Sequence, residues 1–344
     1  MAQLKPAKLA AAGQALLVWR VTRRVIARTA IPKAPPPDIA VRPGRFAAKK
    51  INIMTLKNNQ QFLSPGHNGC AGCGQFVAAR AIMRGLDKNT IIANATGCLE
   101  VTTTAYPQSA WGLPWIHSLF ENAAAVASGI RAALNIKGDT VTKVLVQGGD
   151  GGTFDIGTGL ISGMWERGEN IVYVCYDTEA YSNTGIQASG ATPYGAATTT
   201  TPEGLKSIGS TQRKKDMLGI ALAHGLKYVA QSTAGFPDDI TAKIKKALAT
   251  PGPSYLQILS PCIPGWKINN DESVLMGKLA VQTGLYPLLE YTDGKLSASS
   301  IKADFQAKPV LEYLMKQGRF KHLKNEDLSA IEQLAQANIR KYQI

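Results

Sequence analysis

The stretch Lys143-Val-Leu-Val-Gln-Gly-Gly-Asp-Gly-Gly152 decides the fold of this chain. Its first part, Lys143–Gly149, is a mostly apolar run of strand length that ends in glycines, a pattern typical of a buried strand. A helical pattern at Ile156–Arg167 follows, and then a second apolar run at Asn170–Tyr176. The order strand, helix, strand predicts two parallel neighbours in one sheet.

The same alternation continues on both sides of this unit. Near-continuous apolar strands indicate burial on both faces, so the sequence predicts an α/β fold with a doubly wound, mainly parallel sheet and helices on both faces. Ligands of such sheets bind beyond the carboxyl ends of the strands. Further strands are expected at Thr90–Ala95, Lys227–Ala230 and Ser254–Leu259, and further helices at Gln75–Leu86, Glu121–Ile136, Thr211–His224 and Pro237–Ala249.

The chain of 344 residues divides into three parts by composition. Residues 1–53 hold 11 of the Lys and Arg residues and one acid, so they carry +10 of the total charge of +14. This Pro-containing extension is interpreted either as a docking arm or as sequence upstream of a true start at Met54. Residues 54–285 form the expected main domain, and residues 286–344 an irregular arm followed by helices.

Charge and cysteine content argue against several classes of protein. Outside the extension the chain carries only +4, so no nucleic-acid binding is expected. Five cysteines, an odd number in a long chain, argue against a secreted disulfide framework and favour a reducing, cytoplasmic location. No apolar run approaches the roughly 20 residues that a membrane-spanning helix needs, so no membrane span is expected.

A candidate diphosphate site lies at the carboxyl ends of the two central strands. Gly149, Asp150, Gly151 and Gly152 follow the first strand, and Asp177–Gly185 follows the second. Glycines permit backbone N–H groups to come close to phosphate oxygens. A lone Gly-Asp-Gly also occurs in plain turns, but the second segment in a matching strand context makes a binding site the better interpretation.

The same segments offer hard oxygen ligands for Mg²⁺. The Asp150 carboxylate, the Thr178 hydroxyl and the Ala180 backbone carbonyl supply three, and phosphate oxygens and water would complete an octahedron. Asp150 and Thr178 are separated by one helix and one strand. Both are therefore expected at the ends of adjacent parallel strands.

Four cysteines form a candidate metal centre: Cys70, Cys73, Cys98 and Cys262. The first two are three positions apart, a chelating spacing. Four thiolates bind either a 4Fe–4S cluster or a structural zinc, and spacing alone does not choose between them. The neighbouring segments resemble a thiamine-diphosphate motif, which favours the cluster, because oxidation of a thiamine adduct needs a one-electron acceptor that zinc cannot provide. Cys175 lies within an apolar strand and is expected to be a core residue.

Together these motifs resemble the beta subunits of the pyruvate:ferredoxin oxidoreductase (pyruvate synthase) group in the 2-oxoacid:ferredoxin oxidoreductase family. The resemblance covers about residues 60–325 and does not include the extension. Thr178 stands where many thiamine-diphosphate enzymes carry Asn, a replacement that looks ordinary within this family because a hydroxyl is also a hard ligand. The resemblance is carried by Cys70–Gly74, Thr96–Thr104, Trp111–Ala125, Gly149–Gly157, Cys175–Ala196 and Pro261–Trp266.

The resemblance implies a thiamine-diphosphate-binding fold of the diphosphate-binding type, with thiamine diphosphate, Mg²⁺ and one 4Fe–4S cluster as cofactors. It implies reversible oxidative decarboxylation of a 2-oxoacid, pyruvate first, with the acyl group passed to coenzyme A and the electrons to ferredoxin. Oxalate, phenylglyoxylate and branched-chain 2-oxoacids are the alternative substrates. Asn183 matches a family residue beside the reactive carbon, where its amide would hydrogen-bond the substrate; a loop cap is the alternative interpretation.

The resemblance also implies partner subunits. The family places the Glu that protonates the aminopyrimidine ring in a pyrimidine-binding domain, so a separate alpha subunit is expected to supply it. Gamma and ferredoxin-like delta subunits are implied as well. The apolar, glycine-rich segment Thr96–Phe120 is a candidate contact surface, or alternatively part of this subunit's own core. His67 and His117 are weaker candidates for acid–base roles, because ordinary loop histidines are more common.

Overall fold

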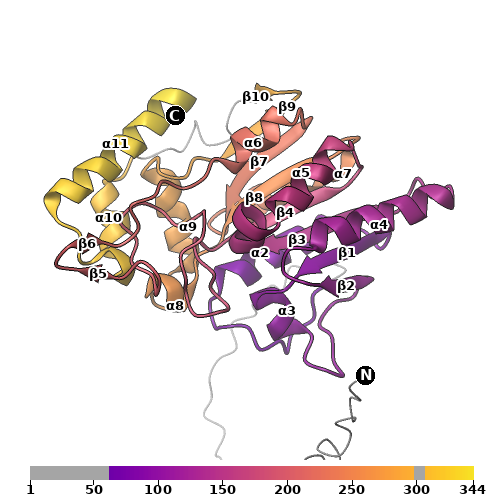
Figure 1. Cartoon of the computed structure of the whole chain (residues 1–344), viewed down its shortest axis with the longest axis horizontal. Helices are drawn as coiled ribbons and strands as arrows, with labels where there is room; N and C mark the ends of the chain where they lie inside the picture. The colour runs from indigo at the N-terminus through magenta and orange to yellow at the C-terminus, as the bar shows by residue number, and fades with distance from the viewer. Residues whose placement is uncertain (1–61, 298–306) are drawn as a thin grey trace, which may run out of the picture. The chain divides into compact units, whose positions relative to one another are not determined.

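The structure, a computed structural model, describes residues 62–297 and 307–344. Its centre is an eight-stranded sheet in the order β10-β9-β7-β8-β4-β3-β1-β2 (Figure 1). The strands from β7 to β2 in this order are parallel, and β9 and β10 continue the sheet as antiparallel neighbours. The bounds are β1 Thr90–Ala95, β2 Trp115–Ser118, β3 Lys143–Gly149, β4 Val172–Asp177, β7 Tyr228–Thr233, β8 Ser254–Leu259, β9 Leu289–Thr292 and β10 Lys295–Leu296.

Helices cover both faces of this sheet. Side chains alternate along a strand, so Leu145 of β3 faces one side while Val144 and Val146 face the other. The mainly parallel, doubly wound α/β fold expected from the sequence is therefore confirmed. On the Leu145 side lie α2 Gly74–Met83 and α7 Pro237–Ala249, and on the other side α4 Ala123–Ile136, α5 Thr158–Glu166 and α6 Met217–Ala223.

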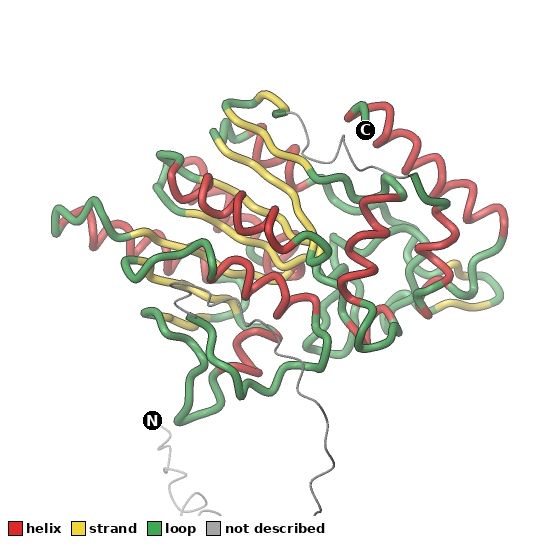
Figure 2. The backbone as a smooth tube through the Cα atoms, turned by 180° about the vertical axis from the view of Figure 1, so that it is seen from behind, coloured by secondary structure: helices red, strands yellow, loops and turns green. Residues whose placement is uncertain are grey.

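A separate group of helices is formed by the chain after β8 and after β10. It packs around Trp266, which is fully buried. Figures 1 and 2 show α10 and α11 on the side of the sheet away from the free end of α4. The elements of this group are α8 Ile263–Trp266, α9 Ser273–Gln282, α10 Val310–Met315, the 3-10 helix η2 Gly318–Phe320 and α11 Asn325–Tyr342.

Two sequence expectations differ from the structure. The helix expected at Thr211–His224 begins only at Met217, because Asp216 caps it by accepting a hydrogen bond from Gly219 N at 2.8 Å. Lys214, just before this cap, is held by ion pairs to buried carboxylates instead of joining the helix. The segment after residue 286 is not an irregular arm at its start, since β9 and β10 extend the sheet there.

The connection from β3 to α5 contains a short π-helix, η1 Gly151–Ile156, and α5 begins at Thr158, two residues after the helix start expected from the sequence. It ends as Gly157 N donates to Gly152 O at 3.0 Å. A Cβ on Gly157 would lie 2.2 Å from that same oxygen, so only glycine fits this close backbone approach. The wide turn places the residues after β3 at the carboxyl edge of the sheet.

Several smaller elements complete the described chain. β5 Glu203–Gly204 and β6 Ser207–Ile208 form a two-stranded hairpin, and α3 Cys98–Thr103 follows β1. The basic extension, residues 1–53, lies outside the described residues. In the part of the chain that the structure describes, no helix combines the length and the apolar character needed to cross a bilayer.

Candidate functional site

Asp150 and Thr178 meet at the carboxyl edge of the sheet. β3 and β4 are parallel neighbours with Gly149 opposite Tyr176, so the residues that follow them come together. The Thr178 backbone N–H and hydroxyl both contact Asp150 Oδ1, at 3.0 and 2.8 Å. The adjacent placement inferred from the spacing is therefore confirmed.

Ala180 and two serines complete a ring of oxygens around this pair. The Ala180 carbonyl oxygen lies 3.0 Å from Thr178 Oγ1, and the Ser182 hydroxyl donates to Thr178 Oγ1 at 2.9 Å. The Ser189 hydroxyl donates to Asp150 Oδ2 at 2.5 Å. A threonine hydroxyl has one hydrogen, so only one neighbouring oxygen can accept it and the others remain free for a cation. This set of hard oxygen donors fits Mg²⁺.

The Asp150 carboxyl group is buried, with 1% of the residue exposed. Burial raises its pKa to about 7, and the nearby Asp177 carboxylate adds to the rise, while hydrogen bonds from Ser189 and Thr178 oppose it. Among residues 62–297 and 307–344, no Lys or Arg forms an ion pair with Asp150. A bound divalent cation would supply the missing positive charge and favour the ionised form.

The glycines of the motif differ in what surrounds them. A Cβ on Gly149 would meet no atom within 4 Å, whereas one on Gly151 would lie 2.3 Å from the Tyr181 ring. A Cβ on Gly152 would lie 3.0 Å from the Phe120 carbonyl oxygen. Gly151 and Gly152 thus let two aromatic residues approach the backbone, a packing requirement that the sequence did not reveal.

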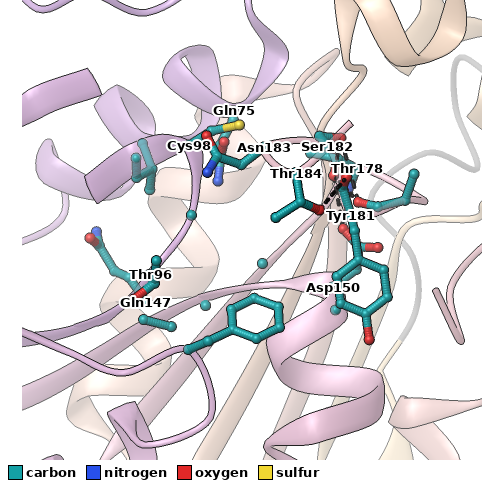
Figure 3. A pocket seen from close by; sticks show the side chains of 18 of the residues that line it. Gln75, Thr96, Cys98, Gln147, Asp150, Thr178, Tyr181, Ser182, Asn183 and Thr184 are labelled. Atoms are coloured by element: carbon teal, nitrogen blue, oxygen red, sulfur yellow. Dashed lines mark hydrogen bonds between the residues drawn. The ribbon is translucent and has the colours of Figure 1, made fainter. Parts of the chain in front are cut away.

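A cavity of about 280 Å³ joins this oxygen site to one of the cysteines. Asp150, Thr178 and Ala180 line it, and so do Cys98 and Asn183. Figure 3 shows Cys98 toward one side of this cavity and Asp150 toward the other. A ligand bound at the oxygens would therefore occupy a cavity that Cys98 also lines.

The four candidate cluster thiols stand at the starts of helices or in turns close to this cavity. Cys70 is in the turn before α2, Cys73 directly precedes α2, Cys98 begins α3 and Cys262 directly precedes α8. A backbone hydrogen bond of 3.1 Å from Gly74 N to Pro261 O ties the first turn to the last. Segments distant in sequence are thereby held together.

Burial and the neighbouring sulfurs set the acidity of these thiols. Burial raises the pKa of Cys73 to about 11, and the Cys262 and Cys70 sulfurs raise it further. Burial raises the pKa of Cys98 to about 12, again with contributions from the other three. Among the described residues, no three His, Cys, Asp or Glu side chains converge on a point that would hold a single metal ion.

Cys175 and the two histidines lie in different environments. Cys175 is fully buried in β4 among core residues, as expected. His67 stacks on Phe76 with ring centroids 3.9 Å apart, and burial lowers its pKa. His117, on the edge strand β2, lies 2.8 Å from the Thr96 hydroxyl.

Comparison with known proteins gives the family. Residues 95–258 match the thiamine pyrophosphate enzyme, C-terminal TPP binding domain. Pyruvate synthase subunit PorB of Methanothermobacter thermautotrophicus is 50% identical over 274 residues, which cover 80% of this chain and 94% of that protein. Ketoisovalerate oxidoreductase subunit VorB of Pyrococcus abyssi is 39% identical over 284 residues, with coverage of 81% and 91%.

A solved structure agrees with these relatives. The 2-oxoglutarate:ferredoxin oxidoreductase from Magnetococcus marinus is similar with a TM-score of 0.53 and 28% identity, over 64% of this chain and 74% of that chain. The family expected from the sequence motifs is thus confirmed. The chain belongs to the 2-oxoacid:ferredoxin oxidoreductase family, as an oxidoreductase beta subunit of the PorB kind with a thiamine-pyrophosphate-binding domain.

Proposed function

We propose that this chain binds thiamine diphosphate through Mg²⁺, holds one 4Fe–4S cluster, and works with partner subunits as a pyruvate:ferredoxin oxidoreductase. Pyruvate and coenzyme A become acetyl-CoA and CO₂, and two electrons pass to ferredoxin, in a reversible reaction. The observation that carries this proposal is the cavity of about 280 Å³, whose wall contains both the Asp150–Thr178 oxygens and the Cys98 residue. The same cavity would thus be shared by the cofactor and by one ligand of the cluster.

The chain's own residues bind and orient the cofactor. The Asp150 carboxylate, the Thr178 hydroxyl and the Ala180 carbonyl would hold Mg²⁺, and backbone N–H groups of Gly149–Gly152 would meet the diphosphate. When bound, thiamine diphosphate supplies the electron sink for decarboxylation. Burial of Asp150 keeps water from competing for these oxygens.

Asn183 is the proposed substrate-facing residue. Asn183 lines the cavity and is exposed to solvent within this chain. No hydrogen bond of its side chain is found within residues 62–297 and 307–344, which supports this role over the alternative of a loop cap. An amide free at the cavity wall can donate to a substrate oxygen and accept from a hydroxyl.

The 4Fe–4S assignment is supported by two observations: the Cys70–Gly74 turn is hydrogen-bonded to Pro261, next to Cys262, and Cys98 lines the cavity. Each thiolate would bind one iron, and backbone N–H groups of the surrounding turns would stabilise the cluster charge. Zinc is the second candidate for this centre. Zinc would leave the oxidative step without a one-electron acceptor in this chain.

Pyruvate is the proposed substrate because relatives named pyruvate synthase match better than those named for another acid. The PorB protein from Methanothermobacter thermautotrophicus is 50% identical, and the VorB protein, named for ketoisovalerate, is 39% identical over a similar share of the chain. Coenzyme A is proposed as the acyl acceptor, and the Magnetococcus marinus relative was solved with coenzyme A bound. A branched-chain 2-oxoacid is the alternative.

The segment Thr96–Phe120 is the proposed contact with an alpha subunit that supplies the pyrimidine-side Glu. Trp111 and Leu113 belong to this subunit's own core, which narrows the surface expected from the sequence. Ile116 and Leu119, in contrast, are 42% and 63% exposed. They lie on or next to β2, the edge of the sheet, where a partner would cover them. Gamma and delta subunits would carry electrons onward to ferredoxin.

The proposal is tested on the anaerobically purified complex by ferredoxin reduction with each 2-oxoacid in turn. Pyruvate with coenzyme A should give the highest kcat/KM. Faster turnover with ketoisovalerate would favour the branched-chain alternative. Absence of reduction with every 2-oxoacid would refute the assigned reaction.

A further inference from the structure

The loop Asp177–Ala180, which carries two of the proposed Mg²⁺ ligands, borders a second cavity as well as the cofactor cavity. Thr178 and Ala180 line the cofactor cavity, whereas Glu179 lines a different cavity of about 310 Å³. On the side of the second cavity the Asp177 and Glu179 carboxylates both contact Lys214 Nζ, at 2.6 and 2.8 Å. Both carboxylates are buried, so they need compensating cations.

The backbone of Glu179 has an uncommon conformation. Its φ is +62°, in the left-handed region that L residues other than Asn and Asp rarely adopt. Such a conformation persists only where neighbouring groups hold it. Because Glu179 stands between Thr178 and Ala180, its backbone angle sets the relative placement of their two oxygens.

Arg319 supplies the main additional support. This residue lies 140 positions further along the chain, in η2, and its Nη2 donates to Glu179 Oε2 at 2.5 Å. The guanidinium is itself fixed, since its Nε donates to Gln317 Oε1 at 3.0 Å. The Arg319 and Glu179 side chains are only 3% and 6% exposed, so water does not screen the pair.

Arg319 also reaches the loop by a second route, through Trp266. The guanidinium carbon lies 4.0 Å from the centroid of the Trp266 ring, and Trp266 Nε1 donates to the Thr178 carbonyl oxygen at 3.0 Å. Trp266 N in turn donates to Cys262 O at 2.8 Å. Arg319 thus contacts Glu179 directly and is linked to Thr178 through Trp266.

We propose that Arg319 and Lys214 are positioning residues for the metal ion of the thiamine-diphosphate site, and that they act by holding Glu179 in its left-handed conformation. This inference rests on the proposed function of that site. The two cations balance the two carboxylates, Asp177 and Glu179, so the group adds no net charge beside Asp150. Its effect on the metal ion is therefore geometric, and the C-terminal segment is part of the cofactor site.

The test uses the full-length chain purified with its partner subunits and stripped of cofactor. Thiamine-diphosphate affinity is titrated as a function of Mg²⁺, and thermal unfolding is followed on the same samples. Arg319→Met should weaken Mg²⁺-dependent binding by roughly 10- to 100-fold, the usual effect of removing a group that orients a metal ligand. Lys243→Met is the matched control, because Lys243 is similarly buried and pairs with Asp239 at 2.7 Å, and neither residue lines the cofactor cavity. It should leave cofactor affinity unchanged.

A double variant separates positioning from charge balance. Adding Glu179→Gln to Arg319→Met removes the carboxylate left without its arginine, so the thermal midpoint should recover while cofactor affinity stays low. Recovery of both together would show that Arg319 only balances charge, and would overturn the inference. If Arg319→Met alone does not fold, the cofactor affinity of the double variant, compared with that of wild type, still tests the positioning role.

Asp150→Ala distinguishes failure of this inference from failure of the site. Wild-type affinity in Arg319→Met, with affinity lost in Asp150→Ala, would refute the positioning role and leave the cofactor site intact. Wild-type affinity in both variants would refute the site itself, and the inference with it.

Discussion

The Ser189 hydroxyl lies 2.5 Å from Asp150 Oδ2, on the carboxylate oxygen that Thr178 does not contact. The two residues are 39 positions apart, and the Ser189 backbone N–H donates instead to Thr192 Oγ1 at 2.9 Å. Each oxygen of the buried carboxylate thus has its own hydroxyl donor. This arrangement fixes the direction in which the carboxylate faces the cavity.

Ser189→Ala should weaken Mg²⁺-dependent thiamine-diphosphate binding by roughly 10- to 150-fold, because a hydrogen bond to a charged group contributes about 1.5–3 kcal/mol. The affinity is measured by titration of the cofactor-free complex. Ser162→Ala, which removes a hydroxyl contact to His224 outside the site, is the control and should bind normally. Equal affinities in the two variants would contradict the role of Ser189.

Asp150→Ala should abolish this binding, whereas Thr178→Ala should have a milder effect. The carboxylate is the only anion among the three proposed ligands, and water can replace a neutral hydroxyl. The measurement is again cofactor titration at several Mg²⁺ concentrations. A larger loss for Thr178→Ala than for Asp150→Ala would contradict this ranking.

Each of the four variants Cys70→Ala, Cys73→Ala, Cys98→Ala and Cys262→Ala should lose iron and stop ferredoxin reduction. Cys175→Ala is the control, since that thiol is buried in the core and only packing is lost. Iron content and electron transfer are measured under anaerobic conditions. Normal values for Cys262→Ala would remove that residue from the ligand set.

Gly157→Ala should destabilise the protein by about 1–3 kcal/mol, because its Cβ would lie 2.2 Å from Gly152 O in the turn that follows β3. Gly159→Ala, two positions further on within α5, is the matched control. Nothing lies within 4 Å of a Cβ there, so alanine should be neutral or stabilise the helix by up to about 1 kcal/mol. Denaturant unfolding compares the two, and equal stabilities would contradict the close approach at Gly157.

The isolated chain should release no CO₂ from a 2-oxoacid, and activity should appear when an alpha subunit is added. The reason is the pyrimidine-side Glu, which the proposed function assigns to that partner. The variant Leu119→Asp, at an exposed position beside the sheet edge, should weaken assembly without loss of the fold. CO₂ release by the single chain would overturn this division of labour.

Strand order made the pairing of Asp150 with Thr178 predictable from the sequence. Both residues directly follow strands of a single crossover unit. The carboxyl ends of adjacent parallel strands lie side by side whatever conformation the loops adopt. Ser189 and Arg319 could not be found in this way, because their contacts depend on the path of long loops and of the C-terminal segment. Ser189 is 39 positions from Asp150, and Arg319 is 140 positions from Glu179, so no local sequence pattern identifies either contact.

Short or tertiary-controlled elements were also missed. β2 has only four residues and gains its strand conformation from pairing with β1, and the four-residue β9 depends on β7 in the same way. Residues before Met217 have good helix propensity, yet Lys214 forms buried ion pairs that keep this segment out of the helix. In each case a long-range contact outweighed the local preference.

The most direct test is the cofactor content of the anaerobically purified complex, compared between wild type, Asp150→Ala and Cys262→Ala. The account predicts bound thiamine diphosphate and iron with sulfide in wild type. Asp150→Ala should lose the thiamine and keep the iron, and Cys262→Ala should lose about four iron atoms per chain while keeping the thiamine. Zinc in place of that iron, or wild-type complex without thiamine, would contradict the central claim that one cavity joins the two cofactors.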